Sequence, residues 1–350
     1  MNLSGPDLVN RKHRDVGMVE AGVRLSMLDR SRTRTGCPEG AALTHTIERA
    51  VAAERLGYHR FWVAEHHAVP GIASGSPPVL LGALGAHTST IRLGSGGVML
   101  PHHQPLVVAE QFLMLDALYP GRIDLGLGRT LGFTAPVRRA LRQDLDDPDT
   151  FAEDIEELQD YLDRTAPVTA RPAAERRIPM FVLATGRGVA LAAGLGLPVV
   201  VGGPVLDSPR LGELLGAYRK DFRPSSRAPE PSVIVSVDVL VADTDAEAAE
   251  LALPEAWAMA RSRQTGEFGP LEPVDAIRSQ TWSNQVRERV EAHLARTTAG
   301  SVETVRRRLD QLAEATGADE LLAFTSTYDR DAQLASDAAL AQIMTARAEV

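Results

Sequence analysis

The chain has 350 residues, of which 44% are hydrophobic and 24% are charged, with a formal net charge of −9. This is the balance of an ordinary globular protein with enough apolar material for a large core, so disorder of the whole chain is excluded. The basic residues are scattered and the net charge is negative, which argues against nucleic acid as a partner. Cys37 is the single cysteine and excludes an intrachain disulfide.

The first segment of the chain differs in character from the rest. Residues 1–20 mix Gly, Pro and charged residues without any period, which predicts a flexible leader ahead of a domain at 21–350. This segment has no apolar core of a secretory signal, and no later stretch approaches ~18 uninterrupted apolar residues. We therefore expect a cytoplasmic protein with no membrane partner.

Short apolar runs bounded by Gly, Pro, Ser or Asp predict strands that are buried on both faces. In chain order these runs are residues 23–28, 60–64, 91–97, 123–128, 179–184, 199–201, 233–241 and 319–324. Segments with helical periodicity are residues 41–56, 78–87, 105–118, 150–163, 188–195, 208–222, 246–261, 285–295, 301–316 and the C-terminal segment. Eight strands that alternate with helices predict a single (β/α)8 TIM-type barrel with insertions.

One insertion and one alternative fold follow from the same pattern. Residues 264–282 are interrupted by Gly and Pro and predict an excursion from the barrel. An open, doubly wound sheet is the alternative architecture. Its dinucleotide-binding version requires G-x-G-x-x-G between the first strand and its helix, and this chain has no such motif there.

Residues that could take part in catalysis or binding are concentrated in residues 58–131, where three predicted strands end in polar or glycine-rich segments. These segments are Glu65-His66-His67, Gly96-Gly97 with His102-His103-Gln104 beyond it, and Gly126 to Arg129. Parallel barrels keep their active sites at the C-terminal ends of the strands. We therefore expect the functional site here, although the triplet alone favours a histidine that only caps or hydrogen-bonds the strand end.

Four separated motifs carry a family resemblance. They are LGYHRFWVAEHH at 56–67, GSGGVMLPHHQPLVVAEQF at 94–112, LYPGRIDLGLGR at 118–129 and GLGLP at 194–198. In this order they resemble the bacterial luciferase-like monooxygenases, flavin-dependent enzymes built on a β/α barrel, from about residue 23 to 324. The resemblance implies that reduced FMN, supplied by a separate flavin reductase, adds O2 as a flavin peroxide and passes one oxygen atom to a small or medium organic substrate.

The resemblance also assigns a catalytic residue and a platform for the cofactor. The histidine that the family conserves after its second strand falls on His66, and an ordinary imidazole pKa near ~6.5 suits proton transfer at neutral pH. Gly96 and Gly97 match two small residues that a non-prolyl cis peptide joins beneath the flavin ring. The plainer interpretation is that these glycines only permit a bulge or tight packing.

For the FMN phosphate, the resemblance implies Thr185 with the backbone amides of Gly186, Arg187 and Gly188, and a charge-assisted contact from Arg129. A helix N-terminus that follows a strand suits an anion because its N–H groups and dipole point the same way. The alternative is that Thr185 is simply the N-cap of the helix. Close relatives carry a hydroxyl at Gly188 and Ala-Pro-Gly after Arg129, so phosphate affinity and the substrate wall are where this chain departs from the family.

The remaining expectations concern the substrate, metals and partners. Met99, His103 and Phe133 are expected to contact the substrate, and the apolar side chains of Met99 and Phe133 are expected to exclude water. No metal is expected, because no carboxylate spacing supports a hydrolase-type site near His102-His103. By family analogy, Phe112, Leu113 and Leu115 lie on a helix that forms a homodimer interface. The alternatives in function are a deazaflavin-dependent oxidoreductase and a flavin-binding barrel without catalysis.

Overall fold

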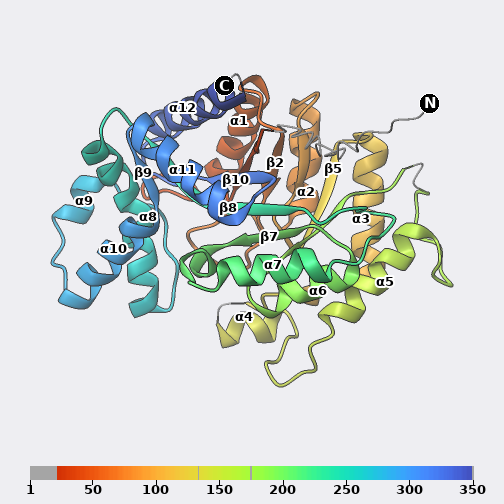
Figure 1. Cartoon of the computed structure of the whole chain (residues 1–350). Helices are drawn as coiled ribbons and strands as arrows, with labels where there is room; N and C mark the ends of the chain where they lie inside the picture. Colours follow the sequence, from red (N-terminus) through yellow and green to blue (C-terminus); the bar gives the residue numbers. More distant parts are fainter. Residues whose placement is uncertain (1–21, 133, 174–175, 349–350) are drawn as a thin grey trace, which may run out of the picture.

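The computed structural model of the chain describes residues 22–132, 134–173 and 176–348, and eight of its parallel strands close into a barrel (Figure 1). In order around the barrel these strands are β1 (Arg24–Asp29), β2 (Arg60–Val63), β3 (Arg92–Ser95), β5 (Ile123–Gly128), β6 (Met180–Leu183), β7 (Val199–Gly202), β8 (Val233–Val241) and β10 (Glu320–Phe324). The barrel closes because β10 pairs with both β1 and β8. The predicted (β/α)8 barrel is confirmed, and the predicted leader at 1–20 lies outside the described residues.

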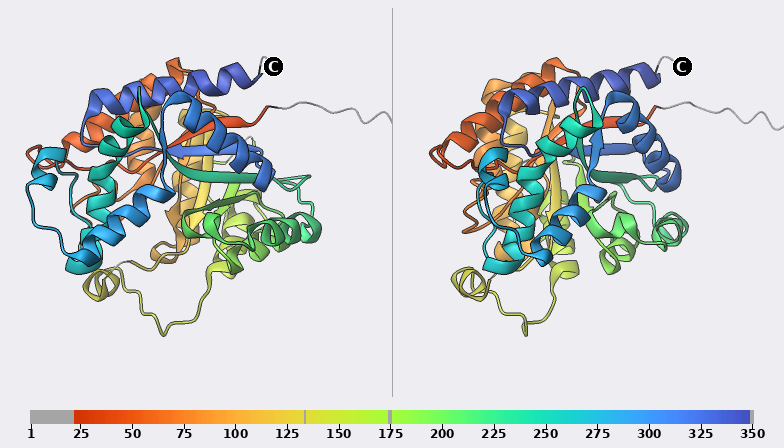
Figure 2. Two further views of the ribbon diagram at one scale, coloured as in Figure 1. Left: turned by 60° about the vertical axis from the view of Figure 1, so that its left-hand side comes forward. Right: turned by 90° about the vertical axis from the view of Figure 1, so that its left-hand side faces the viewer.

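Helices follow the strands and cover the outer surface of the barrel (Figures 1 and 2). These helices are α1 (Ala41–Arg55), α2 (Pro77–His87), α3 (Pro105–Leu118), α5 (Phe151–Asp163), α6 (Arg187–Leu195), α7 (Leu211–Asp221), α11 (Val302–Thr316) and α12 (Arg330–Ala348). The predicted helical period is confirmed in α5, where Phe151, Ile155, Leu158 and Leu162 are all buried. The predicted start of the helix at residue 301 is also confirmed, since Ser301 is its N-cap and its side chain accepts from the backbone N–H of Thr304.

After β8 the chain leaves the barrel and forms a group of helices that lies to one side of it (Figure 1). The group contains α8 (Asp245–Thr265), α9 (Val274–Arg278), α10 (Asn284–Arg296) and the short strand β9 (Thr298–Gly300). The predicted end of α8 at residue 261 is wrong, because the helix continues to Thr265 and ends at its C-cap Gly266, which has a φ of +77°. The short elements α9 and β9 were missed because each is too brief to show a period.

The run at residues 91–97 was predicted as one strand, and this is wrong. The strand stops at Ser95, and after Gly96 and Gly97 the chain resumes as β4 (Val98–Met99). The peptide bond between Gly96 and Gly97 is cis, as the resemblance implied. Both β3 and β4 pair with β5, so the break sits inside the wall of the barrel.

The strands separate two apolar layers by simple alternation. In β2, Phe61 and Val63 belong to the large core between strands and helices, whereas Trp62 belongs to a smaller cluster inside the barrel with Phe181 and Leu322. Successive side chains on a strand point to opposite faces, so this division follows from the sequence of β2.

Buried ion pairs fill the N-terminal end of the barrel interior. Arg60 Nη1 lies 2.8 Å from Asp124 Oδ2, and Arg60 Nε lies 2.7 Å from Glu320 Oε1. Both carboxylate side chains are fully buried. Because Arg60, Asp124 and Glu320 stand at or near the first residues of their strands, this end is occupied. The opposite end, where the strands finish, is the end that carries the site.

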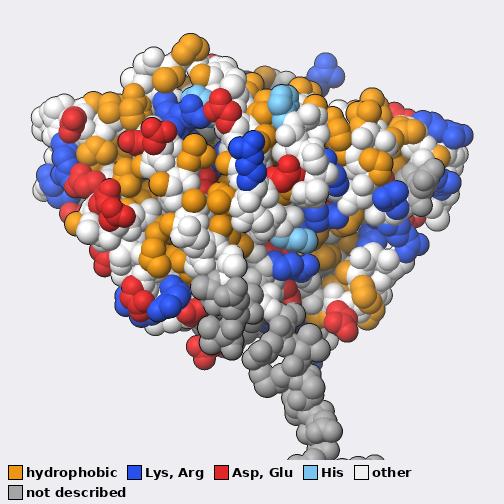
Figure 3. All heavy atoms as spheres, turned by 90° about the horizontal axis from the view of Figure 1, so that it is seen from above, with side chains coloured by type: hydrophobic (Ala, Val, Ile, Leu, Met, Phe, Trp, Pro, Cys, Tyr) orange, Lys and Arg blue, Asp and Glu red, His pale blue; other side chains and the backbone are white. Residues whose placement is uncertain are grey.

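The outer surface has a mixed character. Figure 3 shows acidic, basic and hydrophobic side chains interspersed on the face viewed from above. Among the described residues, every helix is too short or too polar to cross a lipid bilayer.

Candidate active site at the carboxyl ends of the strands

His66 follows β2 at the mouth of the barrel and is partly buried. Its backbone N–H donates to the carbonyl of Ser74 over 2.9 Å. Burial lowers the pKa of His66 to about 4, and the positive charges of Arg30 and Arg32 lower it further. His66 is therefore neutral near pH 7, which suits an imidazole that exchanges a hydrogen bond with a reacting group, whereas a pKa this far below 7 makes it a weak general base.

The charges that act on His66 come from a buried triad. Glu255 on α8 accepts from Arg30 at Oε1 and from Arg32 at Oε2, each over 2.9 Å. Burial would raise the pKa of Glu255, but the two guanidinium groups lower it to about 2. One carboxylate therefore stands between two cations, and the triad keeps a net positive charge beside His66.

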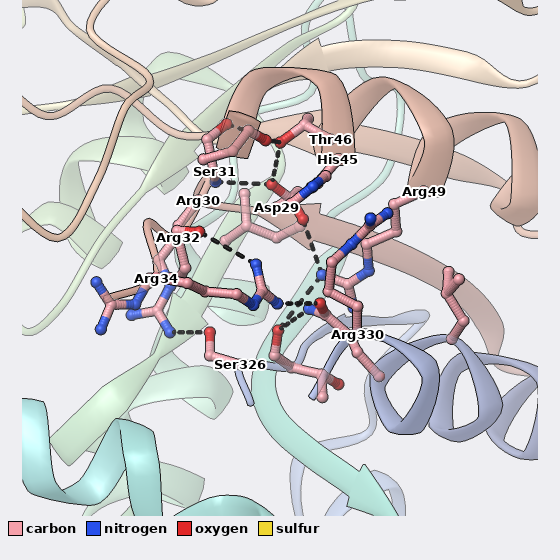
Figure 4. A pocket seen from close by; sticks show the side chains of 15 residues that line it. Asp29, Arg30, Ser31, Arg32, Arg34, His45, Thr46, Arg49, Ser326 and Arg330 are labelled. Carbon is pink, nitrogen blue, oxygen red and sulfur yellow. Dashed lines mark hydrogen bonds and ion pairs between the residues drawn. The ribbon is translucent and has the colours of Figure 1, made fainter. Parts of the chain in front are cut away.

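Arg30 is held over the mouth by neutral contacts as well. Its guanidinium donates to Ser326 Oγ over 2.9 Å and lies 4.9 Å from the centre of the Phe324 ring. Figure 4 shows Arg30 and Ser326 in the wall of a cavity, with Asp29 joined to Thr46 on another side of it. The volume of this cavity is about 20 Å³, so it admits water and not an organic ligand.

A larger opening lies beside the β2 end. His66 and His67 stand in the wall of an open pocket of about 590 Å³, which residues of the loop after β2 and the start of α1 complete. This volume is within the range of ligand pockets in proteins, ~300–1,000 Å³. The structure therefore brings the predicted catalytic histidine to a space that an organic molecule can enter.

Glu65 is the buried centre of the next cluster. Its side chain is fully buried, and Oε1 accepts from Nε2 of both His67 and His103 over 2.7 Å. The backbone N–H of Met99 donates to Oε2 over 3.0 Å. Burial would raise the pKa of Glu65, but the neighbouring imidazoles of His102, His103 and His67 lower it well below its usual range. Glu65 therefore joins the end of β2 to β4 and to the 3₁₀ helix η1 (Leu100–His102).

The cis pair Gly96–Gly97 lies one strand further around the barrel. A Cβ on Gly96 would stand 2.6 Å from Leu28 Cδ1, and a Cβ on Gly97 would stand 2.8 Å from the carbonyl oxygen of Gly126. Tight packing inside the barrel therefore requires glycine at both positions. This gives physical support to the plainer interpretation of the two glycines, and it is compatible with a role as a platform for a planar ligand.

The predicted phosphate residues stand at the start of α6. The N-cap of α6 is Gly186 with a φ of +58°, and no side chain caps it. The alternative that Thr185 is the N-cap is therefore wrong. Thr185, Gly186 and Arg187 are exposed, whereas Gly188 is buried and a Cβ there would stand 2.9 Å from the Cβ of Ala184.

An exposed helix start without a side-chain cap fits the phosphate end of FMN, because its N–H groups and dipole favour an anion. Arg129 follows β5, the neighbour of β6. Its guanidinium lies 2.5 Å from Asp149 Oδ2 and about 6.0 Å from the Phe151 ring. To contact a phosphate, Arg129 must therefore break this exposed ion pair, and such pairs contribute only ~0–1 kcal/mol.

Of the three predicted substrate residues, the structure describes Met99 and His103. Met99 lies on β4, with its sulfur 2.9 Å from where a Cβ on Gly128 would stand. His103 is bonded to Glu65, as described above, and its side chain is 30% exposed. Phe133 lies outside the described residues.

Sequence reasoning missed Arg30, Arg32 and Glu255, because a contact across more than 220 residues leaves no local signal.

With this geometry in view, comparison with known proteins identifies the class. The sequence profile of the luciferase-like monooxygenase family matches residues 23–320. A "Luciferase-like monooxygenase" of Escherichia coli (strain K12) is 38% identical over 326 residues, which cover 91% of this chain and 96% of that protein. The chain belongs to the luciferase-like monooxygenase family, and it is an oxidoreductase of the flavin-dependent monooxygenase type.

More specific relatives cover the chain to different extents. An "N-acetyl-S-alkylcysteine monooxygenase" of Bacillus subtilis (strain 168) is 45% identical over 187 residues, 51% of this chain and 56% of that protein. The crystal structure of apo-MsnO8 matches with a TM-score of 0.83 and 35% identity, over 93% of this chain and 98% of that chain.

Two solved structures of lower identity share the fold and carry different cofactors. The oxygenating constituent of 3,6-diketocamphane monooxygenase from Pseudomonas putida, in complex with FMN, matches with a TM-score of 0.74 at 18% identity, over 93% of this chain and 98% of that chain. An F420-dependent secondary alcohol dehydrogenase matches with a TM-score of 0.65 at 15% identity, over 92% of this chain and 99% of that chain. At these identities the likeness concerns the fold alone.

Proposed function

We propose that this chain is an FMN-dependent monooxygenase that transfers one oxygen atom from O2 to a small or medium organic substrate. The observation that carries the proposal is a neutral His66 at the wall of a pocket of ligand size, at the same end of the barrel as the start of α6. The neutral imidazole of His66 suits a hydrogen bond to the reacting group, and the start of α6 suits the phosphate of FMN. Reduced FMN, when bound, supplies the electrons that activate O2.

The residues of the chain would then divide the work. Thr185, Gly186 and Arg187 hold the phosphate, and Arg129 adds a charge-assisted contact. Gly96 and Gly97 let the backbone approach the flavin ring. His66 accepts a proton from, or hydrogen-bonds to, the reacting centre, while Arg30 above Phe324 adds positive charge at the mouth.

For the substrate class, a thioether such as an N-acyl-S-alkylcysteine is the first candidate to test. The Bacillus subtilis relative that carries this substrate in its name supports the choice. The net positive charge of the Arg30–Glu255–Arg32 triad would also attract the carboxylate of such a molecule toward the mouth of the barrel. Met99 and His103 are the described side chains that we assign to the substrate wall.

The experiment supplies reduced FMN from a separate flavin reductase with NADH and follows ¹⁸O2 incorporation into N-acetyl-S-methylcysteine by mass spectrometry. Incorporation of one ¹⁸O atom per NADH, with little hydrogen peroxide, is the expected result. Retained FMN with peroxide as the only product, across a panel of thioethers and ketones, would favour the flavin-binding barrel without catalysis.

A deazaflavin such as F420 is the second candidate cofactor, because the F420-dependent dehydrogenase shares the fold. A direct binding titration distinguishes the two cofactors. Quenching of tryptophan fluorescence by reduced FMN under anaerobic conditions is expected at micromolar concentration. Saturation by F420 with no response to FMN would overturn the FMN assignment, and activity would then be independent of O2.

We also propose a homodimer, with a corrected interface. Phe112, Leu113 and Leu115 are 0%, 3% and 4% exposed, so they pack within the chain and are unavailable to a partner. The exposed apolar residues of this region are Val79 on α2 and Val107, Met114 and Leu118 on α3. The last three are spaced by seven and four residues, so they form one stripe on the outer face of α3.

A further inference from the structure

The cluster around Glu65 has a composition that hydrogen bonding alone does not explain. One fully buried carboxylate is surrounded by three imidazoles, from His67, His102 and His103. Buried polar groups in proteins nearly always have partners, and an exception calls for a water or an ion. His102 is such an exception, because its side chain is only 3% exposed and neither ring nitrogen has a hydrogen-bond partner among the described residues.

The possible ligand atoms of this cluster lie close together. One donor atom from each of Glu65, His67 and His102 lies within 4.8 Å of the other two. Oε1 of Glu65 is 2.7 Å from His67 Nε2 and 3.8 Å from His102 Nδ1. Tetrahedral zinc with bonds of ~2.0–2.1 Å places its ligands roughly 3.4 Å apart, between these two distances.

We propose that Glu65, His67 and His102 bind a divalent transition-metal ion of the zinc type. Two imidazoles and one carboxylate are a donor set that suits Zn²⁺, with further positions left for water. The ion would take the place of the proton that His67 shares with Glu65, and it would give the buried ring of His102 its missing partner. From the sequence we expected no metal, because no carboxylate spacing supported a hydrolase-type site near His102-His103; Glu65, His67 and His102 come together only in the fold.

The surroundings of the site fix its ligands before an ion arrives. The backbone N–H of Met99 occupies Oε2 of Glu65, which leaves Oε1 directed at the histidines. His103 donates to the same Oε1 and would remain as an outer hydrogen-bond partner, the arrangement that orients carboxylate ligands in metalloproteins. The ring of His67 packs edge-on against that of His102, with centroids 5.4 Å apart. Because its ligands come from the end of β2 and from η1, the ion would fasten these segments together.

The test uses the full chain without a histidine tag, stripped by a chelator and then titrated with Zn²⁺ and with Co²⁺. Calorimetry and elemental analysis after gel filtration are expected to give about one ion per chain. The variant His102→Phe keeps an aromatic ring in the buried space and is expected to weaken binding by more than ~100-fold, since even outer partners of metal ligands contribute 10–100-fold. The matched control is His87→Ala, because His87 is exposed and bonds only to the carbonyl of Ala83 among the described residues.

Binding in the wild type and in His87→Ala that is lost in a folded His102→Phe supports the proposal. Glu65→Gln serves as the second variant if His102→Phe fails to fold by circular dichroism. X-ray absorption of the zinc-loaded wild type needs no variant, and it is expected to show two imidazoles with oxygen donors. Absence of stoichiometric binding in the wild type, equal binding in His102→Phe, or a spectrum without imidazole ligands would each overturn the proposal. None of these readouts depends on flavin or on monooxygenase activity.

Discussion

The Arg30–Glu255–Arg32 triad allows a stability prediction with a worked magnitude. Glu255→Gln removes the one negative charge between the buried guanidinium group of Arg32 and the partly buried one of Arg30, and it turns an amide N–H₂ toward at least one of them. Breaking a buried ion pair from one side costs ~3–5 kcal/mol. The pKa of Glu255 gives an independent value, since the fall from 4.5 to about 2 corresponds to about 3 kcal/mol of stability.

The matched control lies on the same helix. Glu250 pairs with Arg278 on the surface of α8, where both side chains are about half exposed, and such pairs contribute ~0–1 kcal/mol. At ~2.1 cal/mol/K per residue, a loss of 3–4 kcal/mol in a domain of this size lowers Tm by ~4–6 °C. We therefore expect Glu255→Gln to lower Tm by about 5 °C and Glu250→Gln to lower it by about 1 °C or less. Equal shifts in calorimetry or urea unfolding would refute this account of the triad.

The pH dependence of the same effect has a definite sign. Because the folded pKa of Glu255 is depressed, its contribution is complete above pH ~4.5 and is lost as the pH falls toward 2. The stability difference between wild type and Glu255→Gln should therefore shrink over this window, as followed by urea unfolding at each pH. A difference that stays constant from pH 5 down to pH 3 would contradict the assignment of the effect to the carboxylate charge.

Two further predictions concern the site and the interface. His66→Asn is expected to lower turnover by ~100-fold or more at unchanged Tm. With a pKa of about 4, His66 stays neutral above pH ~5, so its titration should not cause any fall in kcat/KM near pH 6.5. If the wild type does show such a fall, it should also be present in His66→Asn. Leu118→Glu, which places a charge on a side chain that is 65% exposed, should convert the proposed dimer to monomer in light scattering with the fold retained. A wild-type chain that is monomeric at micromolar concentration would refute the interface.

The barrel was predictable from the sequence because its signals are local. Each strand is a buried apolar run, and a helix such as α5 presents buried residues at the spacing of one helical face. The elements that were missed are those without a period, such as β4 with two residues and β9 with three. Residues 91–97 were predicted as one continuous strand because the apolar run does not show where the strand stops. The resemblance did imply the cis bond between Gly96 and Gly97.

The candidate site was predictable only in part, for a related reason. Strand ends were visible in the sequence, and they placed His66, Gly96 and Arg129 at one end of the barrel. The electrostatics of His66 depend on Arg30 and Arg32. Both arginines are held by Glu255, which is 225 residues from Arg30 in the sequence and meets it only through the fold. The packing of Phe112 against the core was likewise invisible, because a helical stripe does not say which of its neighbours covers it.

The two adjacent histidines show how one strand end produces two different chemical environments. Both residues follow the end of β2 and stand in the wall of the pocket of about 590 Å³, but their surroundings differ. His67 turns to the Glu65 carboxylate and donates to it over 2.7 Å. His66 instead lies in the positive field of Arg30 and Arg32, which with burial keeps its ring neutral. Of the two imidazoles, His66 is therefore the one that stays neutral and suits a hydrogen bond to a reacting group, and His67 is the one suited to hold Glu65 or a metal ion.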